Sequence, residues 1–276
     1  MKKALQTLFL GLFATGIMHA QVGLHLGFQG QFNSAWVLNQ NNYQLSEMDY
    51  EYKLGPAGGV VLGYNWHQNF GAQIELNYAF MGQDYSDIVR DFSQSYNPDI
   101  PNQLYPVLTY RYVDLRYIQV PMLFKYMEGD AKDAIKYHIL GGLQFGYLVS
   151  ADQRYTADIN ETDEQKDIPQ IEAPQSYVPD FDNAGGITPQ IDYFNRMDIG
   201  VLFDIGVDIY VNDKMYFSPG LRGSFGFLDI NSESTRELEP AKGENIYKAS
   251  HNAFVGVVLG INFMMPDVKF GDTDEY

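Results

Sequence analysis

Residues 197–212 read MDIGVLFDIGVDIYVN, and every odd position from Met197 to Val211 is apolar. The even positions hold three aspartates, two glycines and an asparagine, with Leu202 and Tyr210 as the exceptions. Successive side chains of a β-strand point to opposite faces, whereas a helix repeats every 3.6 residues. This period of two therefore predicts a long strand with one apolar and one polar face.

Seven other segments of the chain alternate in the same way, over 22–32, 59–66, 72–80, 118–126, 137–149, 216–227 and 252–263. Most of these strands exceed the ~9–11 residues that cross a bilayer at a tilt. Their connections alternate between long (33–52, 83–109, 151–195, 229–250) and short (67–69, 127–134, 212–214). The pattern predicts an all-β, eight-stranded antiparallel up-and-down transmembrane β-barrel with four long extracellular loops.

A soluble barrel of the lipocalin type also alternates, with its apolar face inside. The glycines favour the membrane alternative, because they gather on the polar face, where they would weaken an exposed strand without packing anything. In a narrow lumen they make room for long polar side chains from neighbouring strands. The polar-face glycines are Gly27, Gly59, Gly63, Gly142, Gly146, Gly200, Gly206, Gly220, Gly226, Gly256 and Gly260. Pro56, Pro121 and Pro219 each remove a backbone donor, and we expect them at bulges or strand ends.

The composition excludes several classes of function. The 276 residues include 18 Lys and Arg against 35 Asp and Glu, a net charge of −17, so nucleic acid is not an expected partner. The absence of cysteine excludes disulfides, Cys-ligated zinc and thiol catalysis. With 45% hydrophobic and 15% aromatic residues, the chain is too apolar to be disordered.

The beginning of the chain predicts export. Lys2 and Lys3 precede an apolar run over 4–18, and Ala20 offers a small residue at a cleavage edge before Gln21. This arrangement indicates a signal peptide over 1–20, with a membrane anchor as the less favoured alternative because the run is short. The barrel then spans 21–265, both termini are expected in the periplasm, and a short acidic tail over 266–276 is expected to face a periplasmic partner.

Three stretches resemble strands of PorT-like outer-membrane barrels of the Bacteroidetes: YIQVPMLFKY at 117–126, GGLQFGYL at 141–148 and DIGVD at 204–208. The resemblance extends over most of 21–265, the loops excepted. It implies a non-enzymatic eight-stranded barrel in the outer membrane, and a weaker link to protein secretion machinery. The acidic tail after Phe263 departs from the usual pattern, in which the chain ends on an aromatic residue.

The polar face also places ionisable residues in the expected lumen. Because charges removed from water need partners, we predict a structural network of ion pairs and hydrogen bonds that fills the barrel. A proton or ion path through Asp204, Asp208 and Arg222 is the alternative. Arg116 would join the network if a bulge shifts the alternation of its strand. The predicted network residues are Glu75, Lys125, His138, Asp198, Asp204, Asp208 and Arg222.

No cofactor, metal or catalytic residue is predicted. His25 and His251 are expected at opposite ends of neighbouring strands, His67 lies in a turn, and no Ser–His–acid set converges. Residues 158–164 are rich in acids but lack the glycine that a calcium loop needs at its sixth position.

The connection over 151–195 is the most distinctive expected surface, being acidic and rich in proline. Its aromatic residues are candidates for binding a partner, because exposed aromatics anchor interfaces. These candidates are Tyr155, Tyr177, Phe181 and Tyr193.

Three functions follow as hypotheses. The first is a structural or interaction component of the cell envelope that contacts lipid and lipopolysaccharide and engages other outer-membrane or secretion-system proteins. The second is a small channel that passes a solute or ion, and the third is an outer-membrane enzyme. The first leads, since a lumen of eight strands is just wide enough for side chains to fill.

Overall fold

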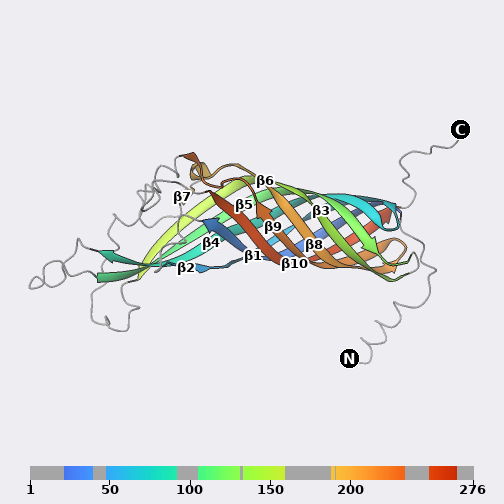
Figure 1. Cartoon of the computed structure of the whole chain (residues 1–276), viewed down its shortest axis with the longest axis horizontal. Coiled ribbons are helices and arrows are strands. Elements are labelled where there is room, and N and C mark those ends of the chain that lie inside the picture. The colour runs from blue at the N-terminus through green and yellow to red at the C-terminus, as the bar shows by residue number, and fades with distance from the viewer. Residues whose placement is uncertain are drawn as a thin grey trace, which may run out of the picture.

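A computed structural model describes residues 22–39, 48–91, 105–130, 133–158, 188–189, 191–233 and 249–265 of the chain. These residues form a barrel of antiparallel strands, which are tilted relative to its long axis (Figure 1). The expected signal peptide 1–20 and tail 266–276 lie outside the described residues, as do Tyr177 and Phe181. So does the side chain of Tyr155.

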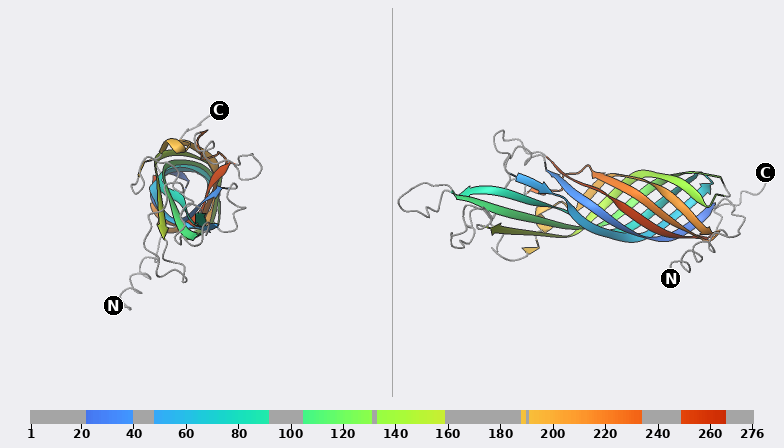
Figure 2. Two further views of the ribbon diagram at one scale, coloured as in Figure 1. Left: turned by 90° about the vertical axis from the view of Figure 1, so that its left-hand side faces the viewer. Right: turned by 90° about the horizontal axis from the view of Figure 1, so that it is seen from below.

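Eight strands close the barrel, and each pairs with the next along the chain. The first and last of them also pair, from Leu24 with Met265 to Asn39 with Ser250, so the wall has no open edge (Figure 2). This confirms the predicted eight-stranded antiparallel barrel. The eight are β1 (Gly23–Asn39), β3 (Lys53–His67), β4 (Phe70–Asp91), β5 (Tyr105–Glu128), β6 (Ile135–Asp158), β8 (Met197–Asn212), β9 (Met215–Gly226) and β10 (Ser250–Met265).

Short elements are added at one end of the barrel. Strand β2 (Met48–Glu51) pairs with β4, and β7 (Thr188–Pro189) pairs with β6 just before the 3-10 helix η1 (Ile191–Tyr193). We call this end, where the long connections lie, the loop end, and the opposite end, with the short turns, the turn end. Among the residues described, none forms a helix long and apolar enough to cross a membrane.

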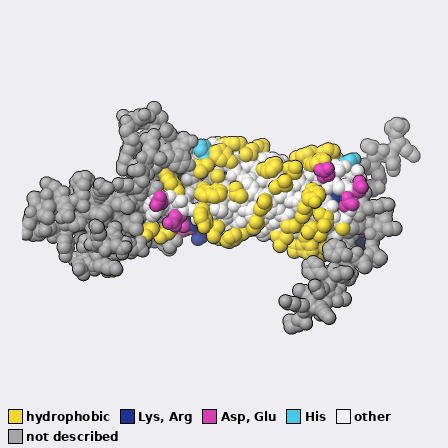
Figure 3. All heavy atoms as spheres, turned by 60° about the horizontal axis from the view of Figure 1, so that its bottom comes forward, with side chains coloured by type: hydrophobic (Ala, Val, Ile, Leu, Met, Phe, Trp, Pro, Cys, Tyr) yellow, Lys and Arg dark blue, Asp and Glu magenta, His cyan; other side chains and the backbone are white. Residues whose placement is uncertain are grey.

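The alternation of the sequence sorts the side chains between the two faces of the wall. In β8, Phe203 and Ile205 are 56% and 51% exposed on the outside, whereas Asp204 between them is 1% exposed and faces inward. Hydrophobic side chains cover the face of the barrel drawn in Figure 3, and the charged ones lie towards its two ends. The wall is thus apolar outside and largely polar inside, as in a barrel that faces lipid.

Several strands run further than the alternation predicted. Both ends of the expected loop 83–109 are strand, because β4 and β5 pair as far as Asp91 with Tyr105 and project beyond the barrel (Figure 2). Strand β1 likewise reaches Asn39, and β6 reaches Asp158. Backbone pairing continues past the apolar belt, where no burial on one face imposes an alternation, so the pattern in the sequence fades before the strand ends.

The prolines within the strands lie at gaps in the backbone ladder. Pro121 falls between the β4–β5 pairs of Met122 and Gln119, and the register is the same on both sides of the gap. Pro219 lies in a similar gap between β8 and β9. Both were expected at bulges or strand ends, which is wrong: they sit within strands, and only the ladder on one side is interrupted. Pro56 precedes the first β3–β4 pair, Ala57 with Ala79. Each proline therefore avoids a position that needs its missing N–H.

One side chain joins three strands where β3 stops pairing with β4. The Gln83 amide oxygen accepts from the backbone N–H of Val37 at 3.1 Å, and its nitrogen donates to the backbone oxygens of Glu51 and Asp84. Nearby, the Lys53 ammonium lies 2.8 Å from Asp84 and 2.7 Å from Asp114. These contacts hold the wall together at the loop end.

Candidate functional site

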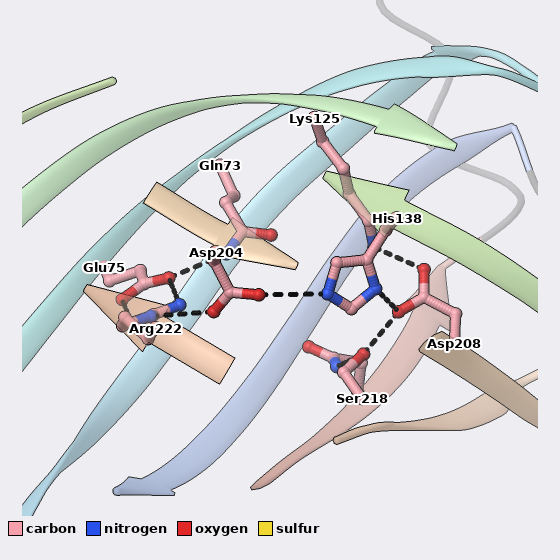
Figure 4. A network of polar contacts seen from close by, with 9 residues as sticks. Gln73, Glu75, Lys125, His138, Asp204, Asp208, Ser218 and Arg222 are labelled. Carbon is pink, nitrogen blue, oxygen red and sulfur yellow. Dashed lines mark hydrogen bonds and ion pairs between the residues drawn. The ribbon is translucent and has the colours of Figure 1, made fainter. Parts of the chain in front are cut away.

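The centre of the lumen holds six charged or ionisable side chains in one continuous chain of contacts (Figure 4). They come from five strands, and each is at most 3% exposed. The alternation of each strand turns these side chains inward. We call them the lumen network: Glu75 on β4, Lys125 on β5, His138 on β6, Asp204 and Asp208 on β8, and Arg222 on β9.

Arg222 forms one end of the lumen network. Two of its nitrogens donate to the two oxygens of Glu75, at 2.7 and 3.0 Å, and Nε donates to Asp204 Oδ2 at 2.9 Å. Glu75 also accepts from amide side chains on β1 and β4. These donors are Gln29 at 2.5 Å, Gln73 at 2.7 Å and Asn77 at 2.9 Å. Paired, planar bonds of this kind are the stronger class of hydrogen bond and fix the geometry of both partners.

His138 joins this end to the other. Its Nε2 lies 3.2 Å from Asp204 Oδ1, and its Nδ1 lies 2.9 Å from Asp208 Oδ1. Asp208 in turn accepts from Lys125 Nζ at 2.5 Å and from the Ser218 hydroxyl at 2.6 Å. Every carboxylate in the lumen network therefore has a cation within hydrogen-bonding distance, and the numbers of positive and negative charges are equal when the imidazole is protonated.

Glycines give the network its space. A Cβ on Gly206 would lie 2.8 Å from His138 Nε2, and one on Gly220 would lie 2.8 Å from Asp204 Oδ1. A cavity of about 20 Å³ remains between Lys125, His138, Asp204 and Arg222, enough for about one water molecule. The lumen is thus packed with side chains at this level, and it has no room for a larger solute.

Asp198 is the predicted network residue that the structure sets apart. It faces the lumen nearer the loop end, where Asn252 Nδ2 donates to its carboxylate at 2.9 Å. The same nitrogen lies 3.1 Å from the hydroxyl oxygen of Tyr117. Asp198 thus belongs to a separate polar group beside the lumen network.

Arg116 was expected to turn into the lumen only if a bulge shifted the alternation of its own strand, and that shift does not occur. A bulge does occur beside it, but the extra residue, Val149, lies on β6 between the partners of Arg116 and Tyr117. Strand β5 keeps its parity, so Arg116 stays outside. There it lies 5.6 Å from the Phe80 ring centroid and 3.9 Å from Asp152.

Apolar side chains fill the lumen at the loop end. Two of them come from connections between strands: Phe194, 5% exposed, and Ile230, 2% exposed. The two connections are tied by a bridge between Phe194 and Asn231, and Asn195 donates to the backbone oxygens of Asp229 and Asn231. We call the buried set the mouth cluster: Ala35, Val37, Met81, Tyr85, Val113, Leu115, Tyr117, Leu148, Ala151, Phe194, Ile230 and Phe254.

The sequence interpretation missed Phe194 and Ile230, because neither lies in an alternating segment. Tyr193, proposed as a partner-binding aromatic, is only half-exposed and packs against the mouth cluster. In the sequence, Phe194 and Ile230 each stand beside an asparagine in a connection between strands. That pattern does not distinguish a segment buried in the barrel from a surface loop.

The turn end is also occupied. Tyr216 is fully buried with Tyr210 and Met264, and its ring centroid lies 4.9 Å from that of Tyr210. His25 meets Tyr216 edge-on at 5.9 Å, and Lys125 Nζ lies 5.2 Å from the Tyr216 centroid. The described part of the lumen is therefore filled at three levels: the mouth cluster, the lumen network and this aromatic group.

The arrangement offers little for catalysis. His25 is buried near the turn end opposite Met264, and His251 pairs with Leu38 near the loop end. Within the described ranges, no three His, Asp or Glu side chains are grouped so that they could hold a metal ion. What the lumen network can do is hold opposite walls of the barrel together.

The chain shows low sequence identity to several solved outer-membrane proteins. A search of the curated proteins finds no match. The solved structures that resemble the chain include OprG of Pseudomonas aeruginosa, at 11% identity and a TM-score of 0.41, covering 91% of this chain and 99% of OprG. Neisserial surface protein A shows 10% identity, a TM-score of 0.40 and coverage of 88% and 97%. For Ail of Yersinia pestis the identity is 9%, the TM-score is 0.34, and the coverage is 87% of this chain and 99% of Ail.

The family comparison is the decisive one. Residues 18–232, most of the chain, match the family model described as the outer membrane protein beta-barrel domain. That stretch includes the strands that carry the whole lumen network. The chain therefore belongs to the outer membrane protein beta-barrel domain family, and its place is the outer membrane.

Proposed function

We propose that this protein is a non-enzymatic anchor in the outer membrane, whose barrel holds the segments at its loop end in place for another component of the cell envelope. The filled lumen carries the proposal. A solute would have to displace the mouth cluster and then break the contacts of Arg222 with Glu75 and Asp204, all of them buried. Breaking one partner from a buried ion pair costs about 3–5 kcal/mol.

The orientation belongs to the same proposal. With the predicted signal peptide removed, both termini lie in the periplasm, and the loop end faces away from the cell. The projecting β4–β5 hairpin and the segment 159–187 would then be the parts available to a partner, and lipid and lipopolysaccharide would surround the apolar belt. The resemblance of 117–126 to PorT-like barrels supports the narrower proposal that the partner is part of a protein secretion machine.

The partner can be tested by cross-linking in intact outer membranes. A purification tag is inserted within 234–248, and proteins cross-linked to the chain are identified by mass spectrometry. The matched variant replaces 159–187 by a Gly/Ser stretch of equal length and must keep the compact electrophoretic form of a folded barrel. We expect the original chain to be cross-linked to a defined set of envelope proteins, including secretion subunits. These proteins should be missing from the cross-linked products of the variant. Recovery of the same proteins from both, or of bulk membrane proteins alone, would contradict the proposal.

The closed lumen is tested separately in planar bilayers. We expect the purified protein to give no steady single-channel steps, because side chains fill the barrel. Regular steps of one size would support the channel hypothesis instead. The same recording is made on a variant with Phe194→Ala and Ile230→Ala for comparison. This variant shortens two side chains of the mouth cluster at the loop end and leaves the lumen network unchanged.

A further inference from the structure

The lumen network has an uneven count of permanent charges. Glu75, Asp204 and Asp208 are carboxylates, whereas Lys125 and Arg222 are the permanent cations that contact them. All five side chains are nearly or completely buried. One negative charge is left over unless His138 carries a proton, and an unpaired charge in a dry interior is strongly unfavourable.

The contacts of His138 indicate where that proton is. Both ring nitrogens face a carboxylate oxygen, at 2.9 and 3.2 Å. An ionised carboxylate can only accept hydrogen bonds, and a neutral imidazole has one donor and one acceptor nitrogen. A neutral ring would therefore point a lone pair at one of the two carboxylates, whereas the imidazolium donates to both.

The carboxylates themselves have no need of the proton. Asp204 already accepts from Arg222 Nε at 2.9 Å, and Asp208 accepts from Lys125 Nζ at 2.5 Å. Each contact with a cation favours the ionised carboxylate, which leaves the imidazole as the site of the proton.

The other ionisable groups around His138 do not replace this proton. Towards the turn end, His25 and Tyr216 lie near Lys125, and neither has a hydrogen-bonding partner among the described residues. Lys136, two positions along β6, interacts electrostatically with Asp208, but it shares its charge with Asp130 and Asp133 beside the turn, and its ammonium lies 5.8 Å from the Tyr210 ring centroid. Glu75 is joined to His138 only through Arg222 and Asp204.

We propose that folding binds one proton at His138, and that the resulting imidazolium closes the lumen network by donating one hydrogen bond to Asp204 and one to Asp208. Losing the proton in alkaline solution leaves two carboxylates facing a neutral ring, and the centre of the barrel loosens and takes up water. This goes beyond the anchor function proposed above, and it holds whether or not the barrel has a partner.

Proton binding at His138 determines whether the stability of the folded barrel rises or falls with pH. A histidine of the unfolded chain is mostly neutral above about pH 6.5, so above that pH the folded protein holds a proton that the unfolded chain lacks. Stability must then fall as the pH rises, and the unfolding equilibrium constant grows about tenfold per pH unit for one proton. We expect this slope in urea titrations of the detergent-solubilised full chain between pH 7 and 9, below the range in which lysines titrate.

Two variants separate the proton from the side chain. His138→Gln should be destabilised at pH 7 and lose the slope, because it removes the positive charge. The double variant H138Q/D204N should regain most of the stability without the slope, since it restores a neutral network and keeps a donor or acceptor at each contact. His67→Gln, at the exposed end of β3, is the matched control and should keep the full slope.

Three outcomes would overturn the proposal: a wild-type protein without the slope, a His138→Gln variant that retains it, or a double variant no more stable than the single one. If the variants do not fold, the wild-type protein decides. With ¹⁵N-labelled histidine, NMR of the folded barrel at pH 8 should show one imidazole with protons on both ring nitrogens. A spectrum in which every imidazole is neutral would contradict the assignment.

Discussion

Arg222 on β9 holds Glu75 on β4 with two nitrogens, at 2.7 and 3.0 Å, although 147 residues separate them in the sequence. The two strands are not neighbours in the wall, so the guanidinium reaches across the lumen. The pair links β4 directly to β9 and, through Asp204, to β8. It ties one side of the barrel to the other.

Removing the guanidinium should therefore be severe. Arg222→Met leaves Glu75 and Asp204 buried without their cation, and we expect a loss of about 3–5 kcal/mol in the free energy of unfolding. Urea unfolding in detergent micelles measures it. Arg196→Met is the control, because its pair with Asp192 is exposed, and exposed pairs contribute at most about 1 kcal/mol. Equal effects of the two substitutions would show that the central pair does not hold the barrel.

A methyl group at Gly206 should disturb the lumen network without removing any of its members. The added Cβ would lie 2.8 Å from His138 Nε2 and from Gly220 Cα, so side chain and wall must both move. We expect Gly206→Ala to lower the temperature at which the compact electrophoretic form is lost. Gly30→Ala is the matched control, since a Cβ there meets nothing within 4 Å and should leave that temperature unchanged or slightly raised.

The mouth cluster should control access to the lumen from the loop end. The chain has no cysteine, so Ala151→Cys places a single thiol at a fully buried position of this cluster. In that background Phe194→Ala removes a buried ring, and we expect the thiol to react with a water-soluble maleimide at least about tenfold faster. Phe227→Ala, an exposed ring on the outside, should leave the rate unchanged. A thiol that reacts rapidly before either substitution would mean that the mouth is open.

The outer face of β8 should not tolerate charge. Ile205 is 51% exposed and lies midway along the strand, where the apolar belt faces hydrocarbon. Ile205→Arg should cost about 2–4 kcal/mol of folding free energy in lipid vesicles, as measured by denaturant titration. Asn212→Arg, at the strand end, should cost no more than about 1 kcal/mol. If neither substitution changed the folding free energy, the result would argue against a lipid-facing wall.

The sequence was sufficient to predict the strands of the barrel wall and the faces of their side chains, because burial on one face forces a strict alternation. The parity of β8 turned Asp204 and Asp208 inward, and the same reasoning on β4 and β9 did so for Glu75 and Arg222. It left the side of Arg116 open, because the sequence does not show which strand carries a bulge, and a shift of one residue reverses every side chain beyond it. It failed beyond the apolar belt, where no burial marks the ends of β4 and β5.

The partners within the lumen could not be predicted. Which side chains meet depends on the stagger between strands as the sheet closes, and that quantity has no local signature. Glu75 and Arg222 are an example, since the parity of each strand says only that both point inward. Phe194 was missed for another reason: a single apolar residue in a connection carries no period.

The pairing of β1 with β10 along their full length has a consequence for how the chain folds. Contacts between the two ends of a sequence form late, because a long loop must close first. Until β10 arrives, the sheet has two open edges, and the charges of β4, β5, β8 and β9 cannot surround one another. Hydrocarbon would penalise both the bare edges and the unmatched charges. We therefore expect insertion and closure to be one concerted event, with chains that lack 250–265 held in the aqueous compartment as substrates for chaperones and proteases.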